Sequence, residues 1–211
     1  ETTEVEPRQP RSQNTTMRLP VTRLFASTLG GPVSPSTTTG PPPVYTYFGL
    51  AGRGELSRLV AAAGGVAIDD QRPPEQGHRT YAAELGLTLC NLPVLVDGDV
   101  RLCQSSAIET YLCDVAPKFA RMTPAQRAVD NMFAAVKGEA LDTLNPFVFT
   151  KENWSRAPSE CPALLDRYYG FFERQIPDDG DFVLGLGFPT KADLVVLQAA
   201  DAFAPFNAVR L

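Results

Sequence analysis

The sequence holds few of the residues that build metal centres and nucleic-acid surfaces. It has one histidine, His78, and its four cysteines show no CxxC or zinc-ligand spacing (Cys90, Cys103, Cys113 and Cys161). We therefore expect no metal site. We expect the cysteines to be buried thiols, with the disulfides of a secreted protein as the alternative. The formal net charge of −5 argues against nucleic acid or an anionic membrane surface as a partner.

A long apolar run is also missing. The strongest one, between Arg58 and Asp69, is interrupted by Gly64 and Gly65. A membrane-spanning helix needs about 20 apolar residues, so we expect no transmembrane segment here. Hydrophobic residues make up 44% of the chain and charged residues 20%, as is typical of globular proteins. A chain of 211 residues then fits a soluble protein with one large domain or two small ones.

Residues 1–43 differ from the rest in composition. They are rich in Thr, Pro and Ser and hold four arginines (Arg8, Arg11, Arg18 and Arg23), and no acidic residue occurs between Glu6 and Glu55. This bias resembles an organelle transit peptide and suggests a plastid or mitochondrion, with the cytoplasm as the alternative. Such a segment cannot bury enough of itself to offset its ordering entropy. Residues 1–43 could be a flexible tail, but we favour an arm that binds a partner in a larger assembly.

Residues 44–117 have the pattern of a small α/β unit. Residues 44–48 are β-branched and aromatic, which favours a strand, and residues 54–63 carry an apolar helical face that Gly64 and Gly65 end. Residues 66–68 would form a second strand, parallel to the first. A weak helix is expected around residues 81–85.

A hairpin and another helix complete this unit. Asp97-Gly98 between apolar residues predicts an antiparallel hairpin over residues 92–102. Ser106 and Glu109 are spaced as a capping box for the helix that follows Gln104. The order of elements is that of a thioredoxin-like domain.

Residues 118–211 show only helical patterns. Thr123, Pro124 and Gln126 form a helix start, and a second helix is expected over residues 162–174. Thr190 and Asp193 form another capping box before residues 194–197, which are apolar all round and indicate a dry, buried central helix. The sequence thus predicts an α/β thioredoxin-like N-terminal domain and an all-α C-terminal helical domain.

Four motifs in this order resemble cytosolic glutathione S-transferases over about residues 44–201, and most closely the tyrosine-type sigma, alpha, mu and pi classes. They are Tyr47-Phe48 with Gly52-Arg53-Gly54-Glu55 and Arg58, then Leu92-Pro93-Val94-Leu95, Gln104-Ser105-Ser106-Ala107-Ile108, and the box from Thr190 to Asp193. The resemblance implies the glutathione S-transferase fold, glutathione as co-substrate, a small apolar electrophile as second substrate, and a homodimer.

The resemblance makes Tyr47 the catalytic residue. A free thiol has a pKa of about 8.5, and a tyrosine hydroxyl that donates a hydrogen bond to the sulfur stabilises the thiolate. Tyr45, two residues earlier, leaves open that a strand tyrosine here is only structural. The position of Tyr47 in the Tyr-Phe pair favours Tyr47, and Phe48 is assigned to glutathione binding with it.

The resemblance also implies the residues that anchor the tripeptide. The backbone of Leu92, before a cis Pro93, would bind the cysteinyl part, with an ordinary trans proline as the alternative. Gln104 and Ser105 precede a helix whose N-terminus attracts the γ-glutamyl carboxylate, although Ser105 could simply cap that helix. Arg53 would support the site or form a surface ion pair with Glu55. We assign Thr190 and Asp193 to folding.

Three departures point to a second hypothesis. At the positions of the family's Trp and Lys, which bind the glycine end of glutathione, stand Thr80 and Glu84, and the single tryptophan is Trp154. An acid would repel a carboxylate, though His78 or Arg79 could substitute. We also expect a shortened C-terminus after the central helix, and residues 1–43 are foreign to the ordinary enzyme. The alternative is thus a non-catalytic subunit of this fold, anchored in an assembly by its N-terminal arm.

Overall fold

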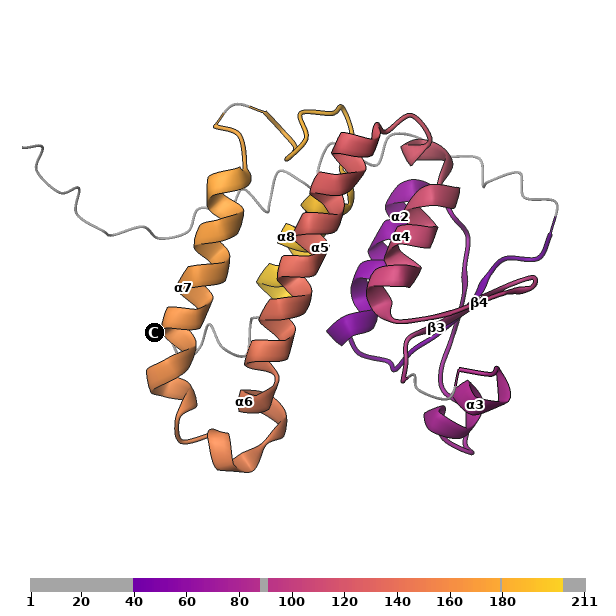
Figure 1. The fold of residues 1–211 in the computed structure, drawn as a ribbon, viewed down its shortest axis with the longest axis horizontal. Helices are drawn as coiled ribbons and strands as arrows, with labels where there is room; N and C mark the ends of the chain where they lie inside the picture. Colours follow the sequence, from indigo (N-terminus) through magenta and orange to yellow (C-terminus); the bar gives the residue numbers. More distant parts are fainter. Residues whose placement is uncertain (1–39, 88–90, 179, 203–211) are drawn as a thin grey trace, which may run out of the picture. The chain divides into compact units, whose positions relative to one another are not determined.

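A computed structural model describes residues 40–87, 91–178 and 180–202, and the following description concerns these residues (Figure 1). All of them belong to one compact unit, Gly31–Leu211. Residues 1–39, which make up nearly all of the expected arm, lie outside the described residues, as do the last residues of the chain. The predictions of a partner-binding arm and of a shortened C-terminus therefore stay predictions.

The sheet has four short strands: β1 (Val44–Thr46), β2 (Asp69–Gln71), β3 (Val94–Asp97) and β4 (Val100–Cys103). Their order is β2-β1-β3-β4; β1 and β2 are parallel, and the other neighbouring pairs are antiparallel. The β1–β2 pair and the β3–β4 hairpin agree with the sequence prediction. The prediction of a strand at residues 66–68 is wrong, because the strand lies three residues later, at Asp69–Gln71. The backbone N–H of Val66 still donates to Ala61 O of the preceding helix, so pairing with β1 begins only at Asp69.

The helices of the α/β part are α2 (Glu55–Gly64), α3 (His78–Glu84) and α4 (Ser105–Val115), with short 3-10 turns η1 (Gly52–Gly54) and η2 (Pro117–Phe119). Helix α2 ends as predicted, because Gly65 takes the left-handed conformation with φ of 79°.

The expected capping box of Ser106 and Glu109 is not formed. Helix α4 begins one residue earlier, at Ser105, and has no side-chain cap. Glu109 is instead buried and paired with Lys137 of the next long helix. The spacing of Ser106 and Glu109 is compatible with a cap, but the packing of α4 turns the Glu109 carboxylate to the ion pair with Lys137.

The second part contains α5 (Pro124–Leu144), α6 (Pro146–Phe149), η3 (Lys151–Asn153), α7 (Ala157–Gln175) and α8 (Lys191–Ala202). Within the described stretch beyond residue 118 no strand occurs. The Thr123–Gln126 capping box is present at the start of α5. Helix α7 starts five residues before the predicted residue 162, at Ala157, and Pro162 lies inside the helix.

Helix α8 lies at the centre of the packing. It contacts both α2 and α5, while α4 contacts α2 and α5 in turn (Figure 1). The central helix is buried as predicted, but it is not dry, because Lys191, Asp193 and Gln198 are buried with its apolar residues. The fold is thus a thioredoxin-like domain followed by a helical domain; the exact boundary at residues 117 and 118 stays a prediction. None of the described helices is long and apolar enough to cross a membrane.

Candidate functional site

The register of the sheet brings three predicted site residues to one edge. Thr46, the last residue of β1, pairs with Val94, and Val94 pairs with Cys103. Tyr47, Pro93 and Gln104 each stand one residue beyond these partners, so they lie side by side where the strands end. Neighbouring strands are about 4.8 Å apart, and one small ligand can therefore span all three positions.

The hydroxyl of Tyr47 is oriented by the loop that follows it. Its oxygen accepts a hydrogen bond from the backbone N–H of Arg53 at 3.1 Å. Its ring packs on Gly54, where an added Cβ would lie 2.2 Å from Cδ1 of Tyr47. The side chain is almost fully buried. The backbone N–H of Arg53 occupies the oxygen as a hydrogen-bond acceptor. The hydroxyl can therefore still donate its own hydrogen to an acceptor in the site.

Tyr45 is used differently. It is fully buried, and its hydroxyl donates to the carbonyl oxygen of Gly54 at 2.8 Å. Burial raises the pKa of Tyr45 well above its ordinary value, despite the opposing influence of Ser57 and Arg58. Its proton is committed to a backbone carbonyl, so the geometry of Tyr45 is that of a structural residue and Tyr47 is the available hydroxyl.

Arg58 of α2 holds the loop after Tyr47, a role that the sequence analysis missed. Its guanidinium donates to Phe48 O at 3.0 Å and to Leu50 O at 3.2 Å. It also pairs with Asp70 of β2 and with Glu55, and it lies 5.6 Å from the ring centroid of Tyr47. One side chain thus ties the loop to both a strand and a helix.

Arg53 forms a different ion pair from the one considered. Glu55 pairs with Arg58, whereas the guanidinium of Arg53 pairs with Asp142 of α5. The tip of the same loop is linked to the helical domain a second time, because Gln198 of α8 donates to Gly52 O at 2.7 Å. The loop beside Tyr47 is therefore fastened from both parts of the fold.

The remaining anchors lie at the other two strands. The peptide bond between Leu92 and Pro93 is cis, and both residues are buried. Gln104 precedes α4 with φ of 70°, a left-handed conformation that is uncommon for a residue other than glycine. Backbone strain of this kind is concentrated at binding sites. Ser105 is half-buried in the first turn of α4, where unpaired backbone N–H groups favour an anion.

Of the residues considered for the glycine end of glutathione, His78 packs against Phe48. Its ring stands edge-on to that of Phe48, with centroids 5.5 Å apart, and Phe48 in turn contacts Tyr47. Arg79, Thr80 and Glu84 are exposed on α3. Sequence spacing had pointed to Thr80 and Glu84; the start of α3 at His78 sets the histidine ring against Phe48, and which residue binds the glycine end stays a prediction.

Thr190 and Asp193 lie away from this edge, at the buried start of α8. Asp193 accepts from the backbone N–H of Thr190 at 2.7 Å, and the hydroxyl of Thr190 donates to Asp130 of α5 at 2.8 Å. Asp130 also accepts from the N–H of Ala192. The carboxylates thus hold the helix start, and Asp130 is a partner that sequence spacing could not reveal.

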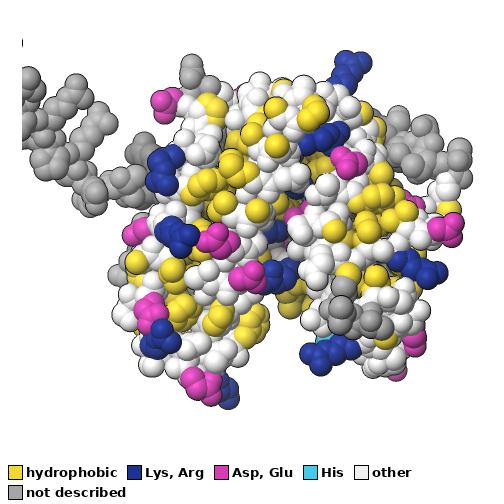
Figure 2. Space-filling view, viewed as in Figure 1, with side chains coloured by type: hydrophobic (Ala, Val, Ile, Leu, Met, Phe, Trp, Pro, Cys, Tyr) yellow, Lys and Arg dark blue, Asp and Glu magenta, His cyan; other side chains and the backbone are white. Residues whose placement is uncertain are grey.

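The molecular surface is notched on the face drawn in Figure 2. Figure 2 shows a notch between the α3 side of the molecule and the end of the α5–α7 hairpin at α6. In the described part of the chain no group of three or more His, Cys, Asp or Glu residues could hold a metal ion.

The cysteines are only partly as expected. Cys113 and Cys161 are buried free thiols, and burial raises the pKa of Cys113 to about 12. Cys103 is disulfide-bonded, contrary to the prediction of thiols; Cys90 lies outside the described residues.

Comparison with known proteins gives consistent relatives. No family model matches the chain. A Dictyostelium discoideum protein whose name assigns it to the glutathione S-transferases, as alpha-2, is 26% identical over 78% of this chain and 76% of its own. A Caenorhabditis elegans protein named likewise, as glutathione S-transferase 7, is 27% identical over 79% of this chain and 82% of its own.

The fold has solved counterparts. A glutathione S-transferase structure from Caenorhabditis elegans matches with a TM-score of 0.63 and 26% identity, covering 80% of this chain and 85% of that one. In sequence and in fold the chain is similar to cytosolic-type glutathione S-transferases.

Proposed function

We propose that this protein conjugates the thiolate of glutathione to a small apolar electrophile, with Tyr47 as the catalytic residue. The observation that carries the proposal is the hydroxyl of Tyr47, oriented by the Arg53 N–H at 3.1 Å. It lies at the same sheet edge as the Leu92–Pro93 bond and the start of α4. The Tyr47-Phe48 motif resembles that of the tyrosine-type classes, which supports the proposal.

The chemistry needs the sulfur as an anion. When the glutathione thiol loses its proton to solvent, the Tyr47 hydroxyl donates a hydrogen bond to the thiolate and stabilises it, which raises the fraction of nucleophile at neutral pH. The thiolate then forms a carbon–sulfur bond with the electrophile; with an aryl halide, the carbon–halogen bond breaks and the halide ion leaves with its electron pair. Tyr47 keeps its proton throughout this step. The Arg53 N–H donates to the hydroxyl oxygen and so orients the hydroxyl to donate its hydrogen bond to the sulfur.

The other residues at the edge would hold the tripeptide. The backbone of Leu92 binds the cysteinyl part, and Phe48 shapes the floor of the site. Gln104, Ser105 and the free N–H groups of α4 bind the γ-glutamyl carboxylate. Arg53, paired with Asp142, positions the loop and not the ligand.

An apolar second substrate fits the loop that follows Tyr47. The side chain of Leu50 is 55% exposed. Its Cδ1 and the hydroxyl oxygen of Tyr47 lie 2.8 Å and 2.7 Å from the point where a Cβ on Gly52 would stand. An uncovered leucine this close to the reacting hydroxyl is a suitable wall for an apolar electrophile.

A matched pair of tyrosine variants tests the proposal. Tyr47→Phe should lower kcat/KM for a chromogenic aryl halide and glutathione by about 10²-fold or more, as expected for loss of a hydrogen bond to a developing anion. It should lower Tm only slightly, because the Arg53 N–H that loses its acceptor is half-buried. Tyr45→Phe should instead lower Tm, because it leaves Gly54 O unpaired, and retain most of the activity. Equal activity of Tyr47→Phe and the wild type would remove Tyr47 from the mechanism.

Isothermal titration with glutathione tests the binding site separately. We expect saturable binding that Ser105→Ala weakens. Absence of binding at millimolar glutathione would favour the non-catalytic subunit instead. The homodimer, the larger assembly contacted by residues 1–43 and the organellar location stay predictions.

A further inference from the structure

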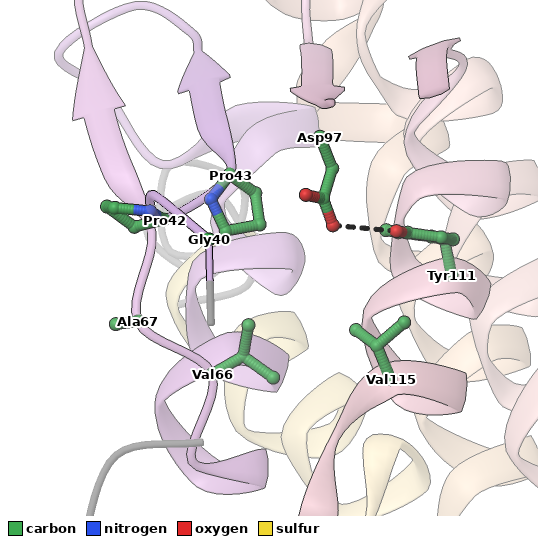
Figure 3. Close-up of a pocket in the computed structure, with 8 residues that line it drawn as sticks. All are labelled: Gly40, Pro42, Pro43, Val66, Ala67, Asp97, Tyr111 and Val115. Atoms are coloured by element: carbon green, nitrogen blue, oxygen red, sulfur yellow. Dashed lines mark hydrogen bonds between the residues drawn. The ribbon is translucent and has the colours of Figure 1, made fainter. Parts of the chain in front are cut away.

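A second pocket lies at the opposite edge of the sheet from Tyr47. Its volume is about 310 Å³, and it is lined where β1 begins, where β3 ends and where the chain enters β2 (Figure 3). Pro43 precedes β1, whereas Tyr47 follows it. The pocket is thus separated from the glutathione site by the length of a strand, and it goes beyond the proposed conjugation activity.

The walls of this pocket are mostly apolar. Pro42, Pro43, Val66 and Ala67 form one side, and Val115 at the end of α4 stands opposite (Figure 3). Val115 is 37% exposed. An apolar hollow of this size lies at the lower end of the range of small-molecule pockets, about 300–1,000 Å³, and admits a single ring or a short alkyl group.

One charged side chain lines the pocket among its described residues, Asp97 at the end of β3. Its Oδ2 accepts a hydrogen bond from the hydroxyl of Tyr111 in α4 at 2.7 Å. Burial, and then the neighbouring carboxylate, raise the pKa of Tyr111 to about 12. The tyrosine therefore remains a donor, and the hydrogen bond fixes the orientation of the carboxylate.

Among the described residues, the second oxygen of Asp97 has no such partner. No hydrogen bond from any described residue reaches Oδ1, and Figure 3 shows this oxygen directed towards Pro43, across the pocket. The bond to Tyr111 anchors the hairpin on α4 with one oxygen only. An oriented carboxylate oxygen among apolar walls is complementary to a positively charged donor, because charge-assisted hydrogen bonds are the strong ones.

We propose that this pocket binds a small organic ammonium ion, a protonated primary amine that carries one compact apolar group. The ammonium donates to Oδ1 of Asp97, and the apolar group lies between Pro43, Val66 and Val115. A carboxylate ligand is excluded by charge repulsion. A neutral ligand of the same shape keeps the apolar contact but loses the ion pair.

The experiment titrates the full-length chain with three probes of one shape: 2-phenylethylamine, 2-phenylethanol and phenylacetate. Chemical-shift perturbation by NMR gives both the affinity and the place of binding. We expect saturable binding of the amine near 1 mM, binding of the alcohol at least about tenfold weaker, and none of phenylacetate. Shifts should be centred on Val66, Asp97 and Val115.

Variants separate the carboxylate from general effects. Asp97→Asn should weaken amine binding about tenfold and bring it to the level of the alcohol. Asp99→Asn, on the same hairpin but outside the pocket lining, should leave amine binding unchanged. Val115→Trp, at an exposed position that tolerates a larger side chain, should close the pocket and abolish binding of the amine.

Three results would overturn the proposal: no saturable binding of the amine, equal affinity for amine and alcohol, or unchanged amine binding in Asp97→Asn. If Asp97→Asn fails to fold, unchanged binding in Val115→Trp overturns it equally. None of these readouts depends on glutathione or on Tyr47, so the failure of this proposal and that of the conjugation activity are distinguishable.

Discussion

Gly54 and Tyr47 are in such close contact that no side chain fits between them. A Cβ on Gly54 would lie 2.2 Å from Cδ1 and 2.4 Å from Cγ of the Tyr47 ring. The carbonyl oxygen of the same glycine accepts a hydrogen bond from the hydroxyl of Tyr45. Gly54 therefore positions one tyrosine by its missing side chain and binds the other by its backbone.

Gly54→Ala should displace the Tyr47 ring and reduce glutathione conjugation. A catalytic group misplaced by about 1 Å can cost up to 10²-fold in rate, so we expect a loss of about tenfold to hundredfold in kcat. Steady-state kinetics with an aryl halide measures it. Gly138→Ala in α5 is the control, because nothing lies within 4 Å of its added Cβ. Full activity of Gly54→Ala would show that the ring has room to move.

The buried pair of Glu109 and Lys137 should dominate the stability of the contact between α4 and α5. The charged atoms are 2.9 Å apart, and both side chains are almost completely buried. Burial raises the pKa of Glu109 and lowers that of Lys137, so each needs the other to remain charged. Lys137→Met should cost about 3–5 kcal/mol of unfolding free energy, because a buried carboxylate is left alone.

Urea unfolding of a double-mutant cycle measures this coupling. Adding Glu109→Leu to Lys137→Met should restore most of the lost stability, since an apolar pair often replaces a buried ion pair at little cost. Arg167→Ala removes the exposed partner of Glu139 and should cost about 1 kcal/mol or less. Additive losses in the double variant would contradict the coupling.

Asp70 should make stability depend on pH in the acid range. Burial by itself raises its pKa, but hydrogen bonds and charges from Arg58 and Arg72 outweigh burial and hold the pKa below the ordinary value. A lowered pKa means that the stabilisation is fully present above the unfolded-state pKa of about 3.9. It is lost as the pH falls through the lower folded-state pKa.

Urea midpoints of the wild type and Asp70→Asn should therefore differ at pH 7 and converge near pH 2–3. Asp99→Asn, in the hairpin turn, serves as the control and should follow the wild type. A difference between wild type and Asp70→Asn that persists unchanged into acid would show that the carboxylate acts without its charge.

His78 should recognise the glycine end of glutathione, a prediction that rests on the proposed function. The imidazole stands against Phe48, where an N–H can reach a carboxylate. His78→Ala should weaken glutathione binding about tenfold, equivalent to about 1.4 kcal/mol, and leave binding of γ-glutamylcysteine unchanged, because that dipeptide lacks glycine. Calorimetric titration of both peptides measures the difference.

Glu84→Gln is the companion variant. Glu84 is exposed on α3, so the substitution should leave both affinities as they are. Tighter binding of glutathione by Glu84→Gln would show that the acid faces the ligand after all, as sequence spacing had suggested.

Much of the fold follows from local patterns. The Asp97-Gly98 turn, the Gly65 helix end and the Thr123–Gln126 cap are confirmed, because each depends on neighbouring residues alone. Errors occur where a local pattern competes with distant contacts. Residues 66–68 have strand composition but still follow the helix end, and Glu109 has the spacing of a cap but pairs with Lys137.

The sequence by itself determined the order of elements, the resemblance to glutathione S-transferases and the motifs that carry candidate site residues, since these depend on residue type and spacing. Tertiary structure decided which of the two tyrosines donates its proton to a backbone carbonyl, which of several α3 residues packs against Phe48, and which charges become buried. It also decided that Asp97 and Tyr111 meet above an apolar pocket. Each of these depends on residues far apart in the chain, and a one-residue change in strand register or helix start would reverse it.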